Sequence, residues 1–252
     1  MTRSAETSGQ VVLVVANASD PDAGYVGERF VEHGHRLRSV FRDRGEVDGL
    51  PEDVGHVLLL GSEWSVHAPV DPQALERECS LVGAALAAGV PVLGLCYGAQ
   101  VLAHALGGSV SRADVPEVGL VTVESSDPAL VAPGPWSAFH ADVVEPPPAA
   151  QVVARNRCGV QAFVLPNVLA VQFHPEVRPD VLDGWAQRFP DLVTAAGMVR
   201  ADLATEMRRR ETQARGLAHG LVDAFLARTS GRQDGRPHSV DVGARQSSSS
   251  NP

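Results

Sequence analysis

The segment Val90-Pro-Val-Leu-Gly-Leu-Cys-Tyr-Gly-Ala-Gln100 gives the strongest indication of the fold of this 252-residue chain. Residues 90–95 form an apolar run, which indicates a strand buried on both faces of a sheet. From Tyr97, apolar residues recur with helical periodicity as far as the glycine pair at 107–108, where a helix would end. A Gly-x-Cys-x-Gly turn centred on Cys96 joins the two. The segment therefore predicts a strand, a sharp elbow and a helix, as in an α/β fold.

Cys96 lies where a reactive side chain would stand clear of the sheet. Glycines at 94 and 98 permit a turn too tight for larger residues, and such a turn holds its central residue in a strained conformation. The N-terminus of the following helix favours a thiolate. Given 24 glycines and 3 cysteines, chance would produce about 0.03 such matches. We therefore predict that Cys96 is a nucleophile, against the alternative of a buried cysteine beside a flexible turn.

A thiol nucleophile needs a base, and the base needs an acceptor that orients it. The candidates lie in the segment Val-Gln-Phe-His-Pro-Glu at 171–176, directly after an apolar run. His174 and Glu176 are two residues apart, so in an extended segment they share a face. Glu176 can then accept from one ring nitrogen of His174 while the other faces the sulfur of Cys96, and Pro175 stiffens the segment. The sequence predicts a triad of these three side chains.

The remaining sequence predicts alternating strands and helices, and then a strand-rich half. In the first part we expect strands at 11–16, 37–41, 56–60 and 90–95, and helices at 23–33, 72–88 and 97–106. Asp71 is expected to cap the second helix, with Pro72 at its first position. Strands at 118–123, 151–154, 159–165 and 168–173 and helical sequence over 180–229 follow. This order favours a flavodoxin-like open sheet, mostly parallel with an antiparallel extension, with helices on both faces.

Composition excludes several classes of chemistry and partner. The net charge of −9 disfavours nucleic acid or an anionic membrane as a partner. All 21 basic residues are arginines, which excludes mechanisms that need a lysine. Three irregularly spaced cysteines indicate neither a disulfide framework nor a zinc site, so we expect no metal or cofactor. Without an apolar signal region or a run of about 20 apolar residues, a cytoplasmic protein is expected.

Four segments together resemble one known family. They are the elbow Gly-Leu-Cys-Tyr-Gly-Ala-Gln at 94–100, Val-Gln-Phe-His-Pro-Glu-Val at 171–177, the loop at 59–66 and Phe-His-Ala-Asp at 139–142. The chain resembles the class I (triad-type) glutamine amidotransferases, and is most similar to stand-alone domains like the glutaminase part of GMP synthetase. The resemblance covers residues 10–190. We expect a disordered N-terminus at 1–9, a C-terminal helical extension at 191–229 and a disordered tail at 230–252.

The resemblance implies roles for individual residues. Cys96 would form a γ-glutamyl thioester with glutamine, His174 would protonate the leaving ammonia and then activate water, and Glu176 would orient His174. It also implies an oxyanion hole and a substrate pocket, with ammonia passing to a separate acceptor enzyme. The oxyanion hole would consist of the N–H groups of Tyr97 and Ser62, beside Gly61. Gln100, Ala141 and Asp142 would bind the substrate.

Two departures from the family pattern leave alternatives open. Ser62-Glu63 replaces the usual Gly-Pro of the oxyanion loop, and Ala141 replaces a glycine in the pocket. The altered pocket motivates a second hypothesis, a hydrolase of γ-glutamyl amides or peptides that needs no partner. A third hypothesis is a non-catalytic binding module that kept the fold, which the complete triad disfavours. A related protease-type or chaperone-type fold is disfavoured because it would not place His-Pro-Glu after a strand.

Overall fold

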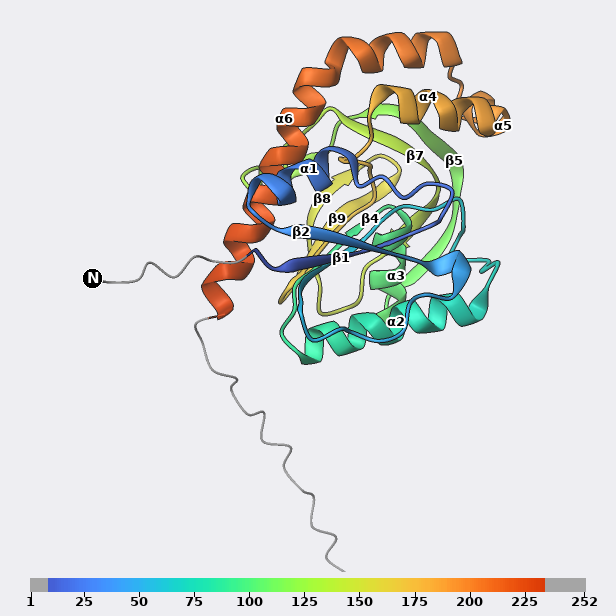
Figure 1. Cartoon of the computed structure of the whole chain (residues 1–252). Coiled ribbons are helices and arrows are strands. Elements are labelled where there is room, and N and C mark those ends of the chain that lie inside the picture. The colour runs from blue at the N-terminus through green and yellow to red at the C-terminus, as the bar shows by residue number, and fades with distance from the viewer. Residues whose placement is uncertain (1–8, 234–252) are drawn as a thin grey trace, which may run out of the picture.

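The structure is a computed structural model that describes residues 9–233 (Figure 1). Its centre is an eight-stranded sheet in the order β2-β1-β3-β4-β10-β9-β8-β6. The first five strands in this order run parallel: β2 (Arg36–Phe41), β1 (Val11–Ala16), β3 (Val54–Leu59), β4 (Val92–Leu95) and β10 (Val168–Val171). The other three extend the sheet antiparallel: β9 (Gly159–Leu165), β8 (Gln151–Asn156) and β6 (Glu124–Ser125). The predicted fold class is confirmed.

Helices cover both faces of this sheet because its parallel strands are apolar on both sides. In β1, Val12 and Val14 face one core and Leu13 and Val15 face the other. One core includes side chains of α1 (Gly24–Glu32) and α6 (Arg200–Gln233), and the other includes α2 (Pro72–Ala87) and α3 (Tyr97–Ala105). In the view of Figure 1, α2 lies below the sheet and α4 and α5 lie above it. Alternation of side chains along each strand thus defines two hydrophobic layers.

A second, two-stranded sheet lies beside the main one. Its strands β5 (Ser109–Val121) and β7 (Trp136–Glu145) pair antiparallel. The short helices α4 (Pro179–Arg188) and α5 (Pro190–Ala195) pack with them and with the start of α6 in a third apolar cluster. Because β7 carries His140, Ala141 and Asp142, this sheet forms one wall of the site described below.

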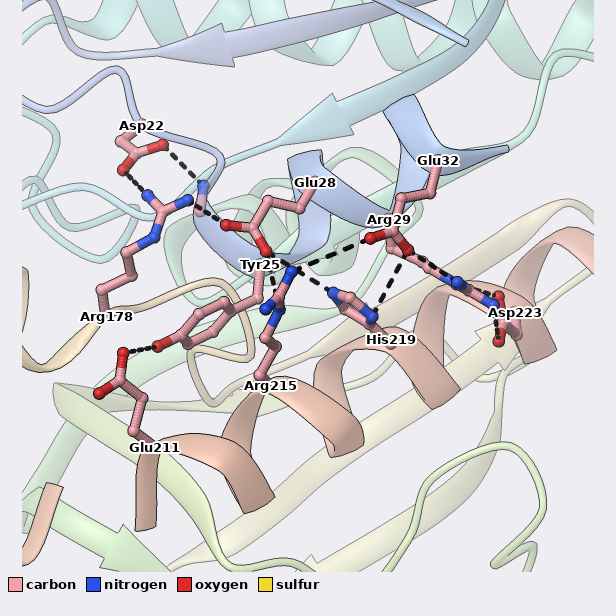
Figure 2. Close-up of polar contacts among 11 residues, drawn as sticks. Asp22, Tyr25, Glu28, Arg29, Glu32, Arg178, Glu211, Arg215, His219 and Asp223 are labelled. Atoms are coloured by element: carbon pink, nitrogen blue, oxygen red, sulfur yellow. Dashed lines mark hydrogen bonds and ion pairs between the residues drawn. The ribbon is translucent and has the colours of Figure 1, made fainter. Parts of the chain in front are cut away.

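The long helix α6 is held against α1 by an apolar face and a polar rim. Leu221, Val222 and Phe225 are buried in the core that α1 also contributes to. At the rim, both oxygens of Asp223 accept from Arg29 at 2.7 and 2.8 Å (Figure 2). No helix among residues 9–233 has the length and apolar character to cross a membrane.

Several predicted elements are confirmed and others need correction. The predicted bounds of β1 and β9 match, and Asp71 caps α2 by accepting from two N–H groups at 3.0 Å each. β5 begins at Ser109 rather than 118, and β7 was not predicted. The helical stretch over 180–229 is three helices, broken where Pro190 and the left-handed Gly197 cannot continue a helix.

The helix α6 continues to Gln233, four residues beyond the end expected for the C-terminal helical extension. The division into an amidotransferase domain at 10–190 and a helical extension from 191 stays a prediction. The expected disorder at 1–8 and 234–252 lies outside the described residues.

Candidate active site

The predicted triad residues meet at the carboxyl ends of neighbouring parallel strands. Cys96 follows β4, and His174 follows β10, which pairs with β4. Gly61 follows β3, the other neighbour of β4. This edge is where ligands bind in open α/β sheets. A cavity of about 270 Å³ opens here, and Cys96, His174 and Gly61 all line it.

Cys96 occupies a strained elbow between β4 and α3. Its φ of 48° and ψ of −105° lie in a backbone region that residues other than glycine rarely adopt. A Cβ on Gly98 would lie 2.2 Å from the carbonyl oxygen of Leu59, and one on Gly94 would lie 2.6 Å from that of Gly98. The Cys96 N–H donates to the Val171 carbonyl at 2.8 Å, which ties the elbow to β10. Both glycines of the motif are therefore required sterically, as the sequence predicts.

His174 is buried between a carboxylate and the thiol. Its Nδ1 lies 2.7 Å from Oε1 of Glu176, so Nε2 is left for the sulfur side. Burial alone would lower the pKa of His174, but the charges of Cys96 and Glu176 and hydrogen bonds to both raise it well above its ordinary value. The raised pKa favours a protonated imidazole beside the sulfur of Cys96. Such a pair can attack an electrophilic carbon and then donate a proton to a leaving group.

Further contacts hold the histidine and its acceptor in place. The rings of Trp185 and His174 pack edge to face, with ring centroids 4.8 Å apart. The backbone N–H of His174 donates to the Ser137 carbonyl at 2.7 Å, and that of Tyr25 donates to the Glu176 carbonyl at 3.0 Å. A Cβ on Gly24 would lie 1.8 Å from this same Glu176 carbonyl, so α1 begins directly against the Glu176 backbone. The imidazole therefore has little freedom to rotate.

The loop after β3 brings the backbone of Gly61 close to the side chains of Cys96 and His174. A Cβ on Gly61 would lie 2.5 Å from Cε1 of His174 and 3.6 Å from Cβ of Cys96. Ser62 lines the cavity, and its Oγ accepts from the N–H of Trp64 at 3.0 Å. Tyr97 is the first residue of α3, where N–H groups have no intrahelical acceptor. Its side chain is buried in the core, so only its backbone faces the elbow.

The three predicted substrate-binding residues, Gln100, Ala141 and Asp142, all line the cavity. Gln100 Oε1 accepts from the N–H of Val66 at 3.4 Å, which links the elbow helix to the oxyanion loop. Asp142 is buried, and Arg112 at the rim approaches its Oδ1 to 3.5 Å. A buried carboxylate with one exposed cationic neighbour can accept from a substrate ammonium group.

His140, next to these residues, is fixed by a buried polar cluster. Its Nδ1 lies 3.0 Å from the Asp142 carbonyl oxygen and its Nε2 lies 3.2 Å from Oε2 of Glu117. Asn156 and Gln161 donate to Glu117 at 2.7 and 2.8 Å. Burial alone would raise the pKa of Glu117, but the hydrogen bond and charge of His140 and the hydrogen bond from Asn156 lower it. This cluster orients the β7 wall of the cavity.

The cavity also has an aromatic wall that the sequence did not predict. Trp185, Phe139 and Phe189 line the cavity, and Phe139 lies 5.8 and 6.3 Å, centroid to centroid, from the other two. Trp185 Nε1 also donates to Asp20 at 2.7 Å. Trp185 and Phe189 lie in predicted helical sequence and Phe139 begins the segment at 139–142, and neither pattern shows that the three share a cavity.

The other two cysteines lie away from this cavity. Cys79 and Cys158 are half-buried, and burial, reinforced by Glu78 and Glu76, raises the pKa of Cys79 to about 11. Burial also raises the pKa of Cys158. Within the described part of the chain, no group of three or more His, Cys, Asp or Glu is arranged to hold a metal ion.

Comparisons with known proteins identify the family. Residues 67–184 match the model of the family described as glutamine amidotransferase class-I. One subunit of the glutamine-hydrolysing GMP synthase of Sulfurisphaera tokodaii is 35% identical over 136 residues, which cover 50% of this chain and 70% of that one. The chain belongs to the class-I glutamine amidotransferase family. Within that family it is similar to this GMP synthase subunit.

Longer relatives and solved structures agree with this assignment. The GMP synthase of Bdellovibrio bacteriovorus is 38% identical over 125 residues, which cover 48% of this chain but only 23% of that protein. A glutamine amidotransferase structure from Thermotoga maritima has a TM-score of 0.76 and 26% identity, covering 86% of this chain and 98% of the other. One from Methylobacillus flagellatus, with a TM-score of 0.75 at 21% identity and coverage of 88% and 96%, shares the fold.

Proposed function

We propose that this amidotransferase hydrolyses the side-chain amide of glutamine through a thioester on Cys96. The sulfur attacks the amide carbon, and the developing oxyanion accepts from the N–H groups of Ser62 and Tyr97. The C–N bond breaks, and the proton on His174 passes to the departing nitrogen, which leaves as ammonia. His174 then takes a proton from water, the hydroxide attacks the thioester, and glutamate and free thiol result. Glu176 holds the imidazole throughout.

One observation carries this proposal. Cys96 and His174, which are 78 positions apart in the chain, line one cavity, and Nδ1 of His174 lies 2.7 Å from Oε1 of Glu176. The purified protein is expected to release glutamate and ammonia from glutamine in equal amounts. Absence of release, even in the presence of a candidate synthetase, would count against the proposal.

We further propose that the ammonia passes to a synthetase on a separate chain. The chain spans about a quarter of the length of the full GMP synthases it matches, and its similarity to a protein named as one subunit of GMP synthase supports a division between two chains. Nucleic acid and membrane are not proposed as partners, given the net charge of −9. A cytoplasmic location and an amidotransferase domain at residues 10–190, with a helical extension from 191, are part of the proposal.

The aromatic wall favours a second candidate, hydrolysis of γ-glutamyl amides with an apolar substituent on the nitrogen. Phe139, Trp185 and Phe189 offer an apolar surface that ammonia does not need. Rates on glutamine would be compared with rates on γ-glutamyl benzylamide and γ-glutamyl methylamide. Higher kcat/KM on the benzyl compound would support this candidate, and equal or lower values would remove it.

A non-catalytic binding module is the remaining alternative. It would not require a reactive thiol. Modification by a glutamine-mimicking electrophile separates the cases, because a Cys96 no more reactive than Cys79 would support the binding module.

A further inference from the structure

Arg42 is a fully buried cation beneath the oxyanion loop. It follows β2 and begins a short 3-10 turn, η1 (Arg42–Arg44), and its side chain is 0% exposed. A guanidinium carries five N–H donors, and the structure gives Arg42 five hydrogen bonds. The acceptors are Glu78 Oε1 at 3.0 Å, Asn17 Oδ1 at 2.7 Å and the backbone oxygens of Gly61, Val15 and Leu60 at 3.1, 3.2 and 3.0 Å.

Two of these bonds fix the peptide that supplies an oxyanion donor and the peptide before it. The carbonyl of Gly61 and the N–H of Ser62 belong to one planar trans peptide, so they point in opposite directions. Holding the Gly61 oxygen against Arg42 therefore aims the Ser62 N–H away from the arginine. The bond to the Leu60 carbonyl holds the preceding peptide in the same way. The loop cannot rotate this unit without breaking a charge-assisted hydrogen bond in the protein interior.

Arg42 also contacts the residue that carries the second donor. Its guanidinium carbon lies 4.9 Å from the centre of the Tyr97 ring, which is 1% exposed. A cation over an aromatic face is attracted by the ring. One side chain thus touches both Gly61, at the oxyanion loop, and Tyr97, at the start of the elbow helix α3.

A buried charge is a costly way to fill this space. Glu78, its counter-ion, is also 0% exposed, and burial raises the pKa of Glu78 against the opposing effect of Arg42. Apolar residues of similar volume often stabilise a core as well as a buried ion pair does. An apolar side chain could not supply planar, forked donors that bind α2, the end of β1 and the loop after β3 at the same time.

We propose that Arg42 is a positioning residue that sets the two halves of the oxyanion hole relative to each other. The inference rests on the proposed function, since it assigns Arg42 to the hole formed by Ser62 and Tyr97. Arg42 does not touch the substrate. It acts through the Gly61–Ser62 peptide and the Tyr97 ring.

The test compares Arg42→Lys with a destabilised control, Val82→Ala, in the full-length protein. Lysine keeps the charge opposite Glu78 but has a single nitrogen that cannot reach all five acceptors. Val82 is buried on α2, one turn beyond Glu78, and makes none of the hydrogen bonds of Arg42. Melting temperatures show how much each variant loses in stability.

Arg42→Lys is expected to lower kcat for glutamine about 10-fold to 100-fold while KM stays within about 3-fold, since oxyanion contacts form in the transition state. Alkylation of Cys96 by iodoacetamide should keep its wild-type rate, because that reaction forms no oxyanion. Hydrogen exchange of a peptide covering residues 60–66 should be faster in Arg42→Lys than in Val82→Ala.

A merely structural role predicts a different pattern. Equal kcat and equal exchange of residues 60–66 in the two variants, at similar melting temperatures, would overturn the inference. If the wild-type protein does not hydrolyse glutamine, the proposed function fails separately. The exchange comparison then decides alone whether Arg42 holds the loop, and unchanged exchange would overturn that role.

Discussion

At the scale of single residues, the site depends on places where backbone must approach a reacting side chain. Gly61 is the clearest case, because its Cα lies so close to His174 that no side chain fits between them. The pair of His174 and Glu176 is packed from the other sides by Trp185 and by the backbone of Tyr25. We therefore expect the reactivity of Cys96 to depend on how tightly the His174 ring is held as well as on which residues form the triad.

Gly61→Ala is therefore expected to displace the imidazole. The new Cβ would lie 2.5 Å from Cε1 of His174, and misplacement by about 1 Å can cost about 100-fold in rate. Steady-state glutaminase assays would measure the loss in kcat/KM. Gly83→Ala is the matched control: Gly83 lies within α2 with no atom near the new Cβ, so activity should be unchanged and the fold slightly more stable. Equal activity in both variants would contradict the proposed geometry.

The three thiols are expected to differ in reactivity. Cys79, whose pKa burial raises to about 11, and Cys158, whose pKa is also raised, should be almost entirely protonated at neutral pH. Cys96 stands at the start of α3 beside His174, a base that can take the proton of the sulfur. Brief treatment with iodoacetamide followed by peptide mass spectrometry should find Cys96 modified first. Faster modification of Cys79 would argue against an activated thiol at the elbow.

At the scale of helices and strands, the sequence predicts those elements that bury apolar residues in a regular pattern. β1 and β9 are buried runs, and both match their predicted bounds. The first part of β5 is mostly exposed and polar, so its residues carry no strand pattern. Its partner β7 is largely buried, but the buried residues include the polar Ser137, His140 and Asp142, so its sequence is not an apolar run. Arg42 and Trp185 could not be predicted as site residues because their roles arise from contacts between elements distant in sequence.

The docking of α6 is expected to depend on its apolar face more than on its ion pairs. Hydrogen bonds from Arg29 lower the pKa of Asp223 to about 2, yet both side chains remain partly exposed and screened by solvent (Figure 2). Asp223→Ala should therefore lower the free energy of unfolding by about 1 kcal/mol or less. Phe225→Ala, which empties a fully buried site, should cost about 3 kcal/mol or more. Urea denaturation would measure both, and a reversed order would show that the ion pairs dominate.

At the scale of the whole molecule, an aromatic cluster between the sheet, α1 and α6 links stability to pH. His56 is 4% exposed and packs against Phe30, Phe225 and His35. Burial, with a smaller effect of His35, lowers the pKa of His56 to about 4. Burial also lowers the pKa of His35. The folded protein thus keeps His56 uncharged down to about pH 4, whereas in the unfolded chain it becomes protonated below about pH 6.5.

The sign of the pH effect follows from the lowered pKa. Stability that depends on neutral His56 is fully present above the unfolded-state value of about 6.5 and is lost as pH falls toward about 4. The loss attributable to His56 is about 3 kcal/mol. His56→Phe should remove that part of the acid sensitivity, as measured by urea unfolding at pH values across this window. Parallel pH profiles for wild type and variant would contradict the assignment.

If the proposed function is correct, Cys96 carries the γ-glutamyl group during turnover, and this intermediate can be trapped. Protein mixed with glutamine is quenched in acid within the first turnovers, digested and analysed by mass spectrometry. We expect a γ-glutamyl thioester on the peptide that contains Cys96, and neither adduct nor glutamate with Cys96→Ala. Glutamate production by Cys96→Ala at the wild-type rate, or an adduct on a different residue, would contradict it.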